Sequence, residues 1–129
     1  MKKYLAYLVI VTSALAIVFG LLVTIGAVPS KYVWGGRVSD AGQLVILELF
    51  TLVINLLIIW FVGMKANLFD QKISPKLLSR ILWIIAILMF LNTIGNIAAK
   101  TIFEKFMAIP TLLTAISIVY IIKKSTNRA

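Results

Sequence analysis

The sequence predicts an all-α integral membrane protein, in which four transmembrane helices form one antiparallel bundle with short loops. Three observations lead to this fold class. Of the 129 residues, 62% are hydrophobic and only 13% are charged, whereas about a quarter of an ordinary soluble domain is charged. Four long apolar runs follow one another, and about 20 apolar residues take a helix across the hydrocarbon. Basic residues gather in alternate loops, as in chains that cross a membrane repeatedly.

The first helix is expected over about residues 4–28, a run without a charged residue. The two lysines before it allow an alternative, a secretory signal peptide. The run exceeds the 7 to 15 apolar residues usual in such peptides, so we interpret it as a retained spanning helix. Small residues, which let two helices approach closely, recur along it at every fourth position. We expect them to form a packing face within one chain or between two copies: Thr12, Ala16, Gly20 and Thr24.

The second and third helices are expected over about residues 43–64 and 75–99. Polar side chains interrupt both apolar runs, and they are considered together below. Ser74 suits the N-cap of the third helix, and Pro75 suits its first helical position.

The fourth helix is expected over about residues 102–123. Its apolar part is short, but Thr101 and Glu104 fit the capping box that satisfies free backbone amides at a helix start. Pro110 lies inside this helix, where it removes one backbone hydrogen bond and should produce a kink. The sequence shows no linker, repeat or low-complexity segment, so we expect residues 1–129 to form one domain.

The distribution of basic residues predicts the orientation. The two termini and the middle loop carry nine of the thirteen lysines and arginines, opposed only by Asp70. Both termini and the middle loop are therefore expected in the cytoplasm, and the membrane is expected to be the cell membrane. The net charge of +9 is then a topology signal and does not require nucleic acid. We expect contacts with anionic lipid headgroups from Lys65, Lys72, Lys76 and Arg80.

Polar residues inside the second and third helices predict a functional region. Glu48 and Asn55 are seven positions apart, about 7 Å and 18 Å below the outer surface, and thus share a helix face. Asn92, Asn96 and Lys100 share a face of the third helix at similar depths. If the faces meet, Glu48 reaches Lys100 or Asn96, and Asn55 approaches Asn92. We expect one polar seam that opens outward, because charged residues in membrane helices face the interior and pair or mark a pathway.

The loop PSKYVWGGRVSDAGQ joins the first two helices. Tyr32 and Trp34 suit the headgroup level, and Ser39 or Asp40 can cap the second helix. Arg37 offers a positive charge near Glu48. The loop is interpreted either as a turn anchored at the interface or as a lid over the polar seam.

Several functional classes are disfavoured by what the chain lacks. It contains no histidine and no cysteine, so most zinc sites, imidazole-ligated haem and His-dependent nucleophiles are excluded. We expect no enzyme activity, cofactor or metal site. The first helix lacks the key glutamate of small multidrug transporters, and the cysteines that vitamin K reductase-like proteins need are missing.

Two functional hypotheses remain. In the first, Glu48, Asn55, Asn92, Asn96, Lys100 and Arg37 form an outward-facing pocket that binds or passes a small polar solute or cation. In the second, the protein is an accessory or scaffold subunit. Its buried polar residues then only fix helix packing, since amides between membrane helices often do so. The first helix then recruits a partner within a larger membrane complex.

Overall fold

The computed structural model describes residues 1–29 and 40–126, and this part of the chain forms four α-helices: α1 (Lys2–Thr24), α2 (Ala41–Lys65), α3 (Pro75–Ile97) and α4 (Ile102–Thr126). The helices contain 23 or 25 residues, which corresponds to about 35 to 38 Å. Each is long and apolar enough to cross a membrane. The all-α, four-helix prediction is confirmed, and the fold fits a small multi-pass membrane protein.

Local capping signals set the helix starts where the sequence indicated. Ser74 accepts a hydrogen bond from the Leu77 amide at 3.2 Å, and Asp40 accepts one from the Gly42 amide at 3.1 Å. In the capping box, the Thr101 hydroxyl accepts from the Glu104 amide at 3.2 Å and donates to the Glu104 carboxylate at 2.9 Å. These side chains satisfy amides that have no partner inside a helix.

The first helix ends four residues earlier than expected. Gly26 has a φ of +84°, a left-handed conformation that glycine adopts at little cost. The amides of Ala27 and Val28 then both donate to the Leu22 carbonyl, at 2.9 and 3.2 Å. This closed turn ends α1 at Thr24 although the apolar run continues.

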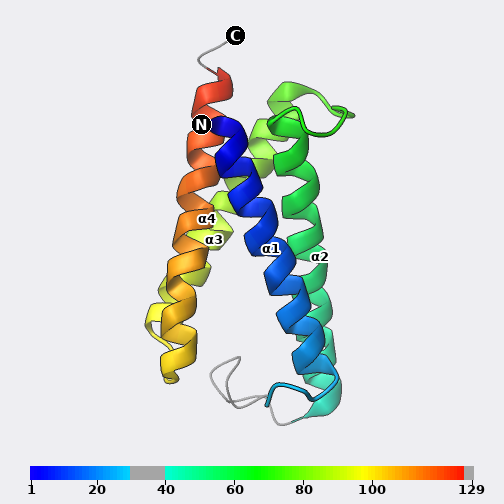
Figure 1. The fold of residues 1–129 in the computed structure, drawn as a ribbon, viewed down its shortest axis with the longest axis vertical. Coiled ribbons are helices and arrows are strands. Elements are labelled where there is room, and N and C mark those ends of the chain that lie inside the picture. The colour runs from blue at the N-terminus through cyan, green and yellow to red at the C-terminus, as the bar shows by residue number, and fades with distance from the viewer. Residues whose placement is uncertain (30–39, 127–129) are drawn as a thin grey trace.

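The helices form two antiparallel pairs, α1 with α2 and α3 with α4 (Figure 1). The N-terminus, the end of α4 and the loop after α2 lie at one end, here called the basic end. Eight of the nine basic residues named as a topology signal are described, and they belong to these segments: Lys2, Lys3, Lys65, Lys72, Lys76, Arg80, Lys123 and Lys124. The other end is called the opposite end. The two pairs meet near the basic end and diverge toward the opposite end (Figure 1).

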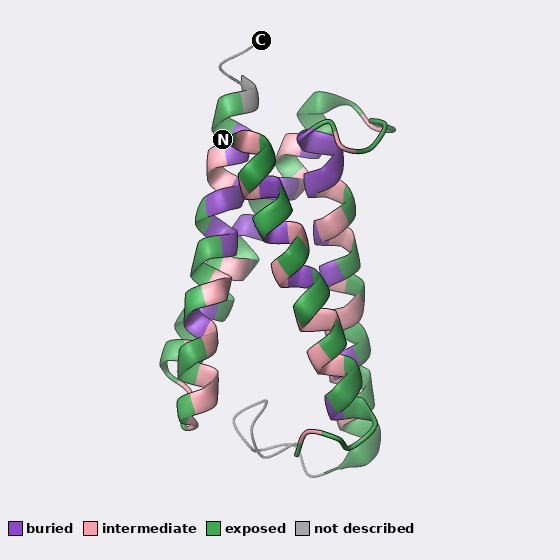
Figure 2. Cartoon of the chain, in the orientation of Figure 1, coloured by how far each residue is buried: buried purple, intermediate pink, exposed green. Residues whose placement is uncertain are grey.

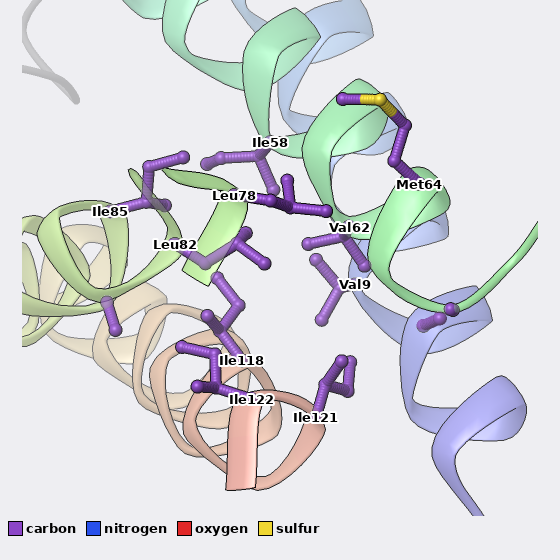
Figure 3. Close-up of a cluster of buried hydrophobic side chains, with 13 residues drawn as sticks. Val9, Ile58, Val62, Met64, Leu78, Leu82, Ile85, Ile118, Ile121 and Ile122 are labelled. Carbon is purple, nitrogen blue, oxygen red and sulfur yellow. The ribbon is translucent and has the colours of Figure 1, made fainter. Parts of the chain in front are cut away.

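The apolar core that joins all four helices lies in the half nearest the basic end (Figures 2 and 3). Figure 3 shows Leu78 and Leu82 of α3 beside Val62 of α2, Val9 of α1 and Ile118 of α4. The buried cluster consists of Ala6, Val9, Ile58, Val62, Met64, Ala66, Leu78, Leu82, Ile85, Ala86, Ile118, Ile121 and Ile122. Farther from the basic end, burial comes mainly from contacts within each helix pair, because the pairs have separated.

One aromatic contact spans the diverging halves. The rings of Phe19 in α1 and Phe103 in α4 stack with their centroids 5.2 Å apart. Both residues lie toward the opposite end of their helices. Large side chains thus connect the two pairs where their backbones have moved apart.

Candidate functional site

Glu48 is buried in the interface between α1 and α2. Only 8% of its surface is exposed, and Asn55, seven residues further along α2, is 9% exposed. The predicted shared face of Glu48 and Asn55 is therefore the buried face of α2. It continues to Val62, another seven residues on, which lies beside Val9 of α1 in Figure 3.

Gly20 allows the carboxylate to lie directly against α1. A Cβ atom at this position would lie 2.8 Å from Glu48 Oε2. Any larger residue at position 20 would force the carboxylate to move.

A partly open cavity of about 70 Å³ lies between α1 and α2, and Glu48 is one of the residues that line it. Among the described residues, its lining comes from the parts of α1 and α2 that lie toward the opposite end. Four of the lining residues are polar or glycine: Gly20, Thr24, Glu48 and Thr51. The other six are apolar: Ala16, Ile17, Leu21, Val45, Leu49 and Leu52. The site thus combines one buried carboxylate with predominantly aliphatic walls.

The hydroxyl protons beside this cavity are already used within their own helices. Thr24 donates to the Gly20 carbonyl at 2.9 Å, and Thr51 donates to the Leu47 carbonyl at 3.0 Å. A hydroxyl that donates once keeps lone pairs that can accept. Both threonines thus hydrogen-bond within their own helices, and the surface of the cavity is mainly apolar.

The buried polar line continues toward the basic end. Ser13 lies seven residues before Gly20, and Asn55 lies seven after Glu48, so the antiparallel register brings both to one level. Ser13 is 3% exposed, and the Asn55 side chain donates to the Thr51 carbonyl at 2.9 Å. The α1–α2 interface thus carries polar groups from the cavity to the middle of the bundle.

The other members of the predicted seam are placed differently. Asn92 and Lys100 are exposed, and Asn96 is half-buried. Asn92 lies seven residues beyond the buried Ile85 and so on nearly the same face of α3. It is exposed because the helix pairs have diverged at its level. The polar seam lies between α1 and α2, whereas the sequence analysis expected it between α2 and α3.

The packing of α3 on α4 explains this difference. The Thr93 and Thr111 hydroxyls form an interhelical hydrogen bond of 2.9 Å. Small residues of α4 are buried around it: Ala108, Thr114, Ala115 and Ser117. Sequence reasoning missed this interface, although the spacing of small residues at 108, 111 and 115 was a visible signal for close approach.

The small-residue face predicted on the first helix packs within the chain. Ala16, Gly20 and Thr24 line the cavity shared with α2, while Thr12 is half-buried and donates to the Leu8 carbonyl at 2.7 Å. The structure shows contacts of this face within the chain, and packing between two copies stays a prediction. The close approach serves the Glu48 site.

The basic residues predicted to contact lipids fall into two groups. Lys72, Lys76 and Arg80 are exposed at the basic end. Lys65 is only 8% exposed, and its ammonium group donates to the Ser79 hydroxyl at 2.6 Å. Lys65 thus holds α2 to α3, because its side chain turns into the packed end of the bundle. Arg37, and with it most of the loop interpreted as a turn or a lid, lies outside the described residues.

Within residues 1–29 and 40–126, no group of three or more acidic, histidine or cysteine side chains is placed to hold a metal ion. A comparison of the chain with models of protein families, with curated proteins and with solved structures finds no match. The functional argument therefore depends on the geometry of the α1–α2 cavity.

Proposed function

We propose that this protein is a small non-enzymatic membrane protein that binds a small cation at Glu48, in the cavity between α1 and α2. The cation enters from the opposite end and is released there or passed across the membrane. Glu48 supplies the charge that selects the ligand. Asn55 and Ser13 continue the polar interface beyond the site.

One observation carries the proposal: Glu48, which is 8% exposed, lines a cavity inside a span of high hydropathy. A charged residue near the centre of a membrane helix costs about 2.5 to 3.5 kcal/mol on insertion scales. Such residues therefore mark functional sites by default. Cavities also reduce stability, because their lining atoms lose packing partners. If the α1–α2 interface served only to hold the helices together, we would expect apolar side chains to fill this space.

The packing of the basic end supports access from the opposite end. The lining of the cavity lies within residues 16–24 of α1 and 45–52 of α2. Between these segments and the basic end lies the buried apolar cluster shared by all four helices. In this arrangement a bound cation would have no polar route through the cluster, so passage across the membrane requires the helix pairs to rearrange.

The proposal places the basic end in the cytoplasm and the cavity toward the exterior of the cell membrane. Exposed Lys72, Lys76 and Arg80 then meet anionic headgroups of the inner leaflet. Because the chain has no cysteine, introduced cysteines can report this orientation. We expect an impermeant maleimide to label Gln43→Cys in intact cells, and Lys72→Cys only after permeabilisation. The reverse labelling pattern would show that the protein has the opposite orientation in the membrane.

The scaffold hypothesis receives less support. It assigned partner recruitment to the small-residue face of the first helix, and three residues of that face line the cavity shared with α2: Ala16, Gly20 and Thr24. A partner that packed on Ala16 and Gly20 would compete with their contacts to α2. In the cation-binding hypothesis, these residues line the site in the positions that the structure gives them.

The decisive experiment compares wild type with Glu48→Gln and Asp70→Asn, purified in detergent. Thermal unfolding is followed in increasing concentrations of single monovalent cations at constant ionic strength. A ligand that binds only the folded state stabilises it by about 2.7 kcal/mol at 100 times its Kd. We expect a saturable, cation-specific rise in Tm for wild type.

Asp70→Asn is the matched control, since it removes one negative charge from an exposed loop position. We expect this variant to keep the response and Glu48→Gln to lose it. Equal responses of wild type and Glu48→Gln to every cation would overturn the proposed function. Uptake into proteoliposomes then separates a binding protein from a transporter.

A further inference from the structure

We propose that the basic end carries a site for the phosphate group of an anionic phospholipid, in a hollow between the start of α1 and the end of α4. This site is separate from Glu48 and does not depend on the proposed cation binding. The proposal follows from the residues that line the hollow, from the lack of acidic residues beside them, and from the apolar surface that continues from the hollow along α4.

The hollow brings together lysines from the first turn of α1 and the last turn of α4. It has a volume of about 130 Å³, and the described residues that line it are Met1, Lys2, Tyr120 and Lys124. Its surface is mainly polar, in contrast to the cavity between α1 and α2. Figure 1 shows the start of α1 beside the last turns of α4. Two lysines that are far apart in the sequence therefore border one space.

The ring of Tyr120 holds the ammonium group of Lys124 near the hollow. The Lys124 Nζ atom lies over this ring, 5.8 Å from its centroid, which is within the range of a cation–π contact. Lys124 is exposed, and its ammonium group has three N–H donors that can bind phosphate oxygens. Lys2 takes part in another interaction, and the proposal requires only its positive charge. Lys124 is therefore the principal ligand-binding residue of the proposed site.

No acidic residue of α1 or α4 balances these charges at the basic end. The sequence of α1 contains neither aspartate nor glutamate, and the acidic residue of α4, Glu104, lies in its first turn at the opposite end. Asp70 belongs to the loop after α2 and is not among the residues that line the hollow. Like charges that share a site repel each other, and a bound anion relieves this repulsion. The neighbouring Lys3 and Lys123 add to the positive potential.

The surroundings of the hollow favour a lipid over a free phosphate ion. The hollow lies at the basic end, where lysines attract anionic headgroups. Ile116 and Leu113 lie four and seven residues before Tyr120 and so on the same face of α4. They are 52% and 47% exposed. An acyl chain can therefore lie along this apolar face while the phosphate group of the same lipid occupies the hollow.

The test measures lipid binding to the intact chain in a neutral detergent by native mass spectrometry. The probes are dioctanoyl phosphatidylglycerol, dioctanoyl phosphatidylcholine, glycerol phosphate and inorganic phosphate. We expect phosphatidylglycerol to bind saturably and more tightly than phosphatidylcholine, because the choline group adds a positive charge beside the two lysines. Glycerol phosphate and inorganic phosphate should bind more weakly than phosphatidylglycerol, because they have no acyl chain to lie along α4.

Lys124→Gln tests the site, and Lys76→Gln is the matched control. Lys76 is exposed at the same end of the bundle but is not among the residues that line the hollow, so both substitutions remove one positive charge from that end. Lys124→Gln should weaken the binding of phosphatidylglycerol by about tenfold or more, as expected for the loss of a hydrogen bond between charged groups. Lys76→Gln should weaken it much less. Equal Tm values of the two variants verify that both are folded.

Three outcomes would contradict the proposal. Equal losses in the two variants would mean that the basic end attracts anionic lipids without a specific site. Equal binding of phosphatidylcholine and phosphatidylglycerol would exclude selection by the positive charges. If glycerol phosphate or inorganic phosphate binds as tightly as phosphatidylglycerol, the ligand is a soluble phosphate and the lipid assignment is wrong. Since none of these measurements involves Glu48, they leave the proposed cation binding to its own test.

Discussion

The two helix pairs solve the same packing problem in different ways. Both bring small residues together, Gly20 in the α1–α2 pair and Ala115 in the α3–α4 pair. Between α3 and α4, the Thr93 and Thr111 hydroxyls bond across the interface. Between α1 and α2, Thr24 and Thr51 donate within their own helices and border a cavity beside a carboxylate.

This difference indicates a division of roles. An interhelical hydrogen bond contributes to the association of membrane helices, whereas a cavity and a buried carboxylate reduce stability. The α3–α4 pair therefore resembles a structural support. The α1–α2 pair retains features that oppose stability, as functional sites commonly do.

The largest contrast is expected from adding the same bulk to each interface. Ala115 is fully buried and lies one turn from Thr111, on the face toward α3. Ala115→Leu should destabilise the protein by about 1 to 3 kcal/mol through overpacking. Ala16→Leu adds the same three carbon atoms beside the α1–α2 cavity and should cost less than half as much. Chemical denaturation in mixed micelles measures both.

Ala16→Leu should also abolish the cation response of the Glu48 site, since its side chain occupies the cavity. Equal destabilisation by the two substitutions would mean that the cavity is filled when the protein folds in a membrane. The distinction between the two pairs would then fail.

A smaller effect is expected from the hydrogen bond between α3 and α4. Thr93→Val and Thr111→Val each remove one hydroxyl with little change of shape. Polar contacts between membrane helices average about 0.6 kcal/mol in double-mutant cycles, and we expect a coupling free energy of that size here. Unfolding curves of wild type, the two single variants and the double variant give this coupling free energy. Additive losses would show that the two hydroxyls act independently.

The parts of this structure that depend on nearby residues were predictable from the sequence. The capping residues Ser74 and Thr101 determine their helix starts within one turn, so the motifs alone located them. The seven-residue spacing of Glu48 and Asn55 correctly placed them on one face. The number and length of the helices followed from the apolar runs.

The choice of the helix that covers that face was not predictable by the same reasoning. It depends on how α3 packs against α4, which leaves Asn92 outside the α2 interface. A usable signal existed in α1, where Gly20 reaches the level of Glu48 when the first two helices are paired as neighbours. Consecutive elements are usually adjacent in space, so a pairing of α1 with α2 was at least as well supported by the sequence as the expected contact of α2 with α3.

A still smaller effect tests the ion pair that the sequence suggested. Lys100 is exposed, whereas Glu48 is buried against Gly20. We expect Glu48→Gln and Lys100→Met to change the free energy of unfolding additively, within about 0.3 to 0.5 kcal/mol. Recovery of stability in the double variant would restore the predicted pair and make Glu48 a structural residue. Thermal unfolding of the four proteins decides between these outcomes.

The smallest effect is expected at Asn92, which the sequence placed in the polar seam. Its side chain is exposed, so Asn92→Ala should change the unfolding free energy by no more than about 0.5 kcal/mol. The substitution should also leave cation binding at Glu48 unchanged, because the described residues that line the cavity belong to α1 and α2. A loss as large as that of Thr93→Val would mean that α3 meets α2 at this depth in the membrane. A loss of cation binding would extend the site to α3, and the divergence of the helix pairs would then be a conformation that closes when the ligand binds.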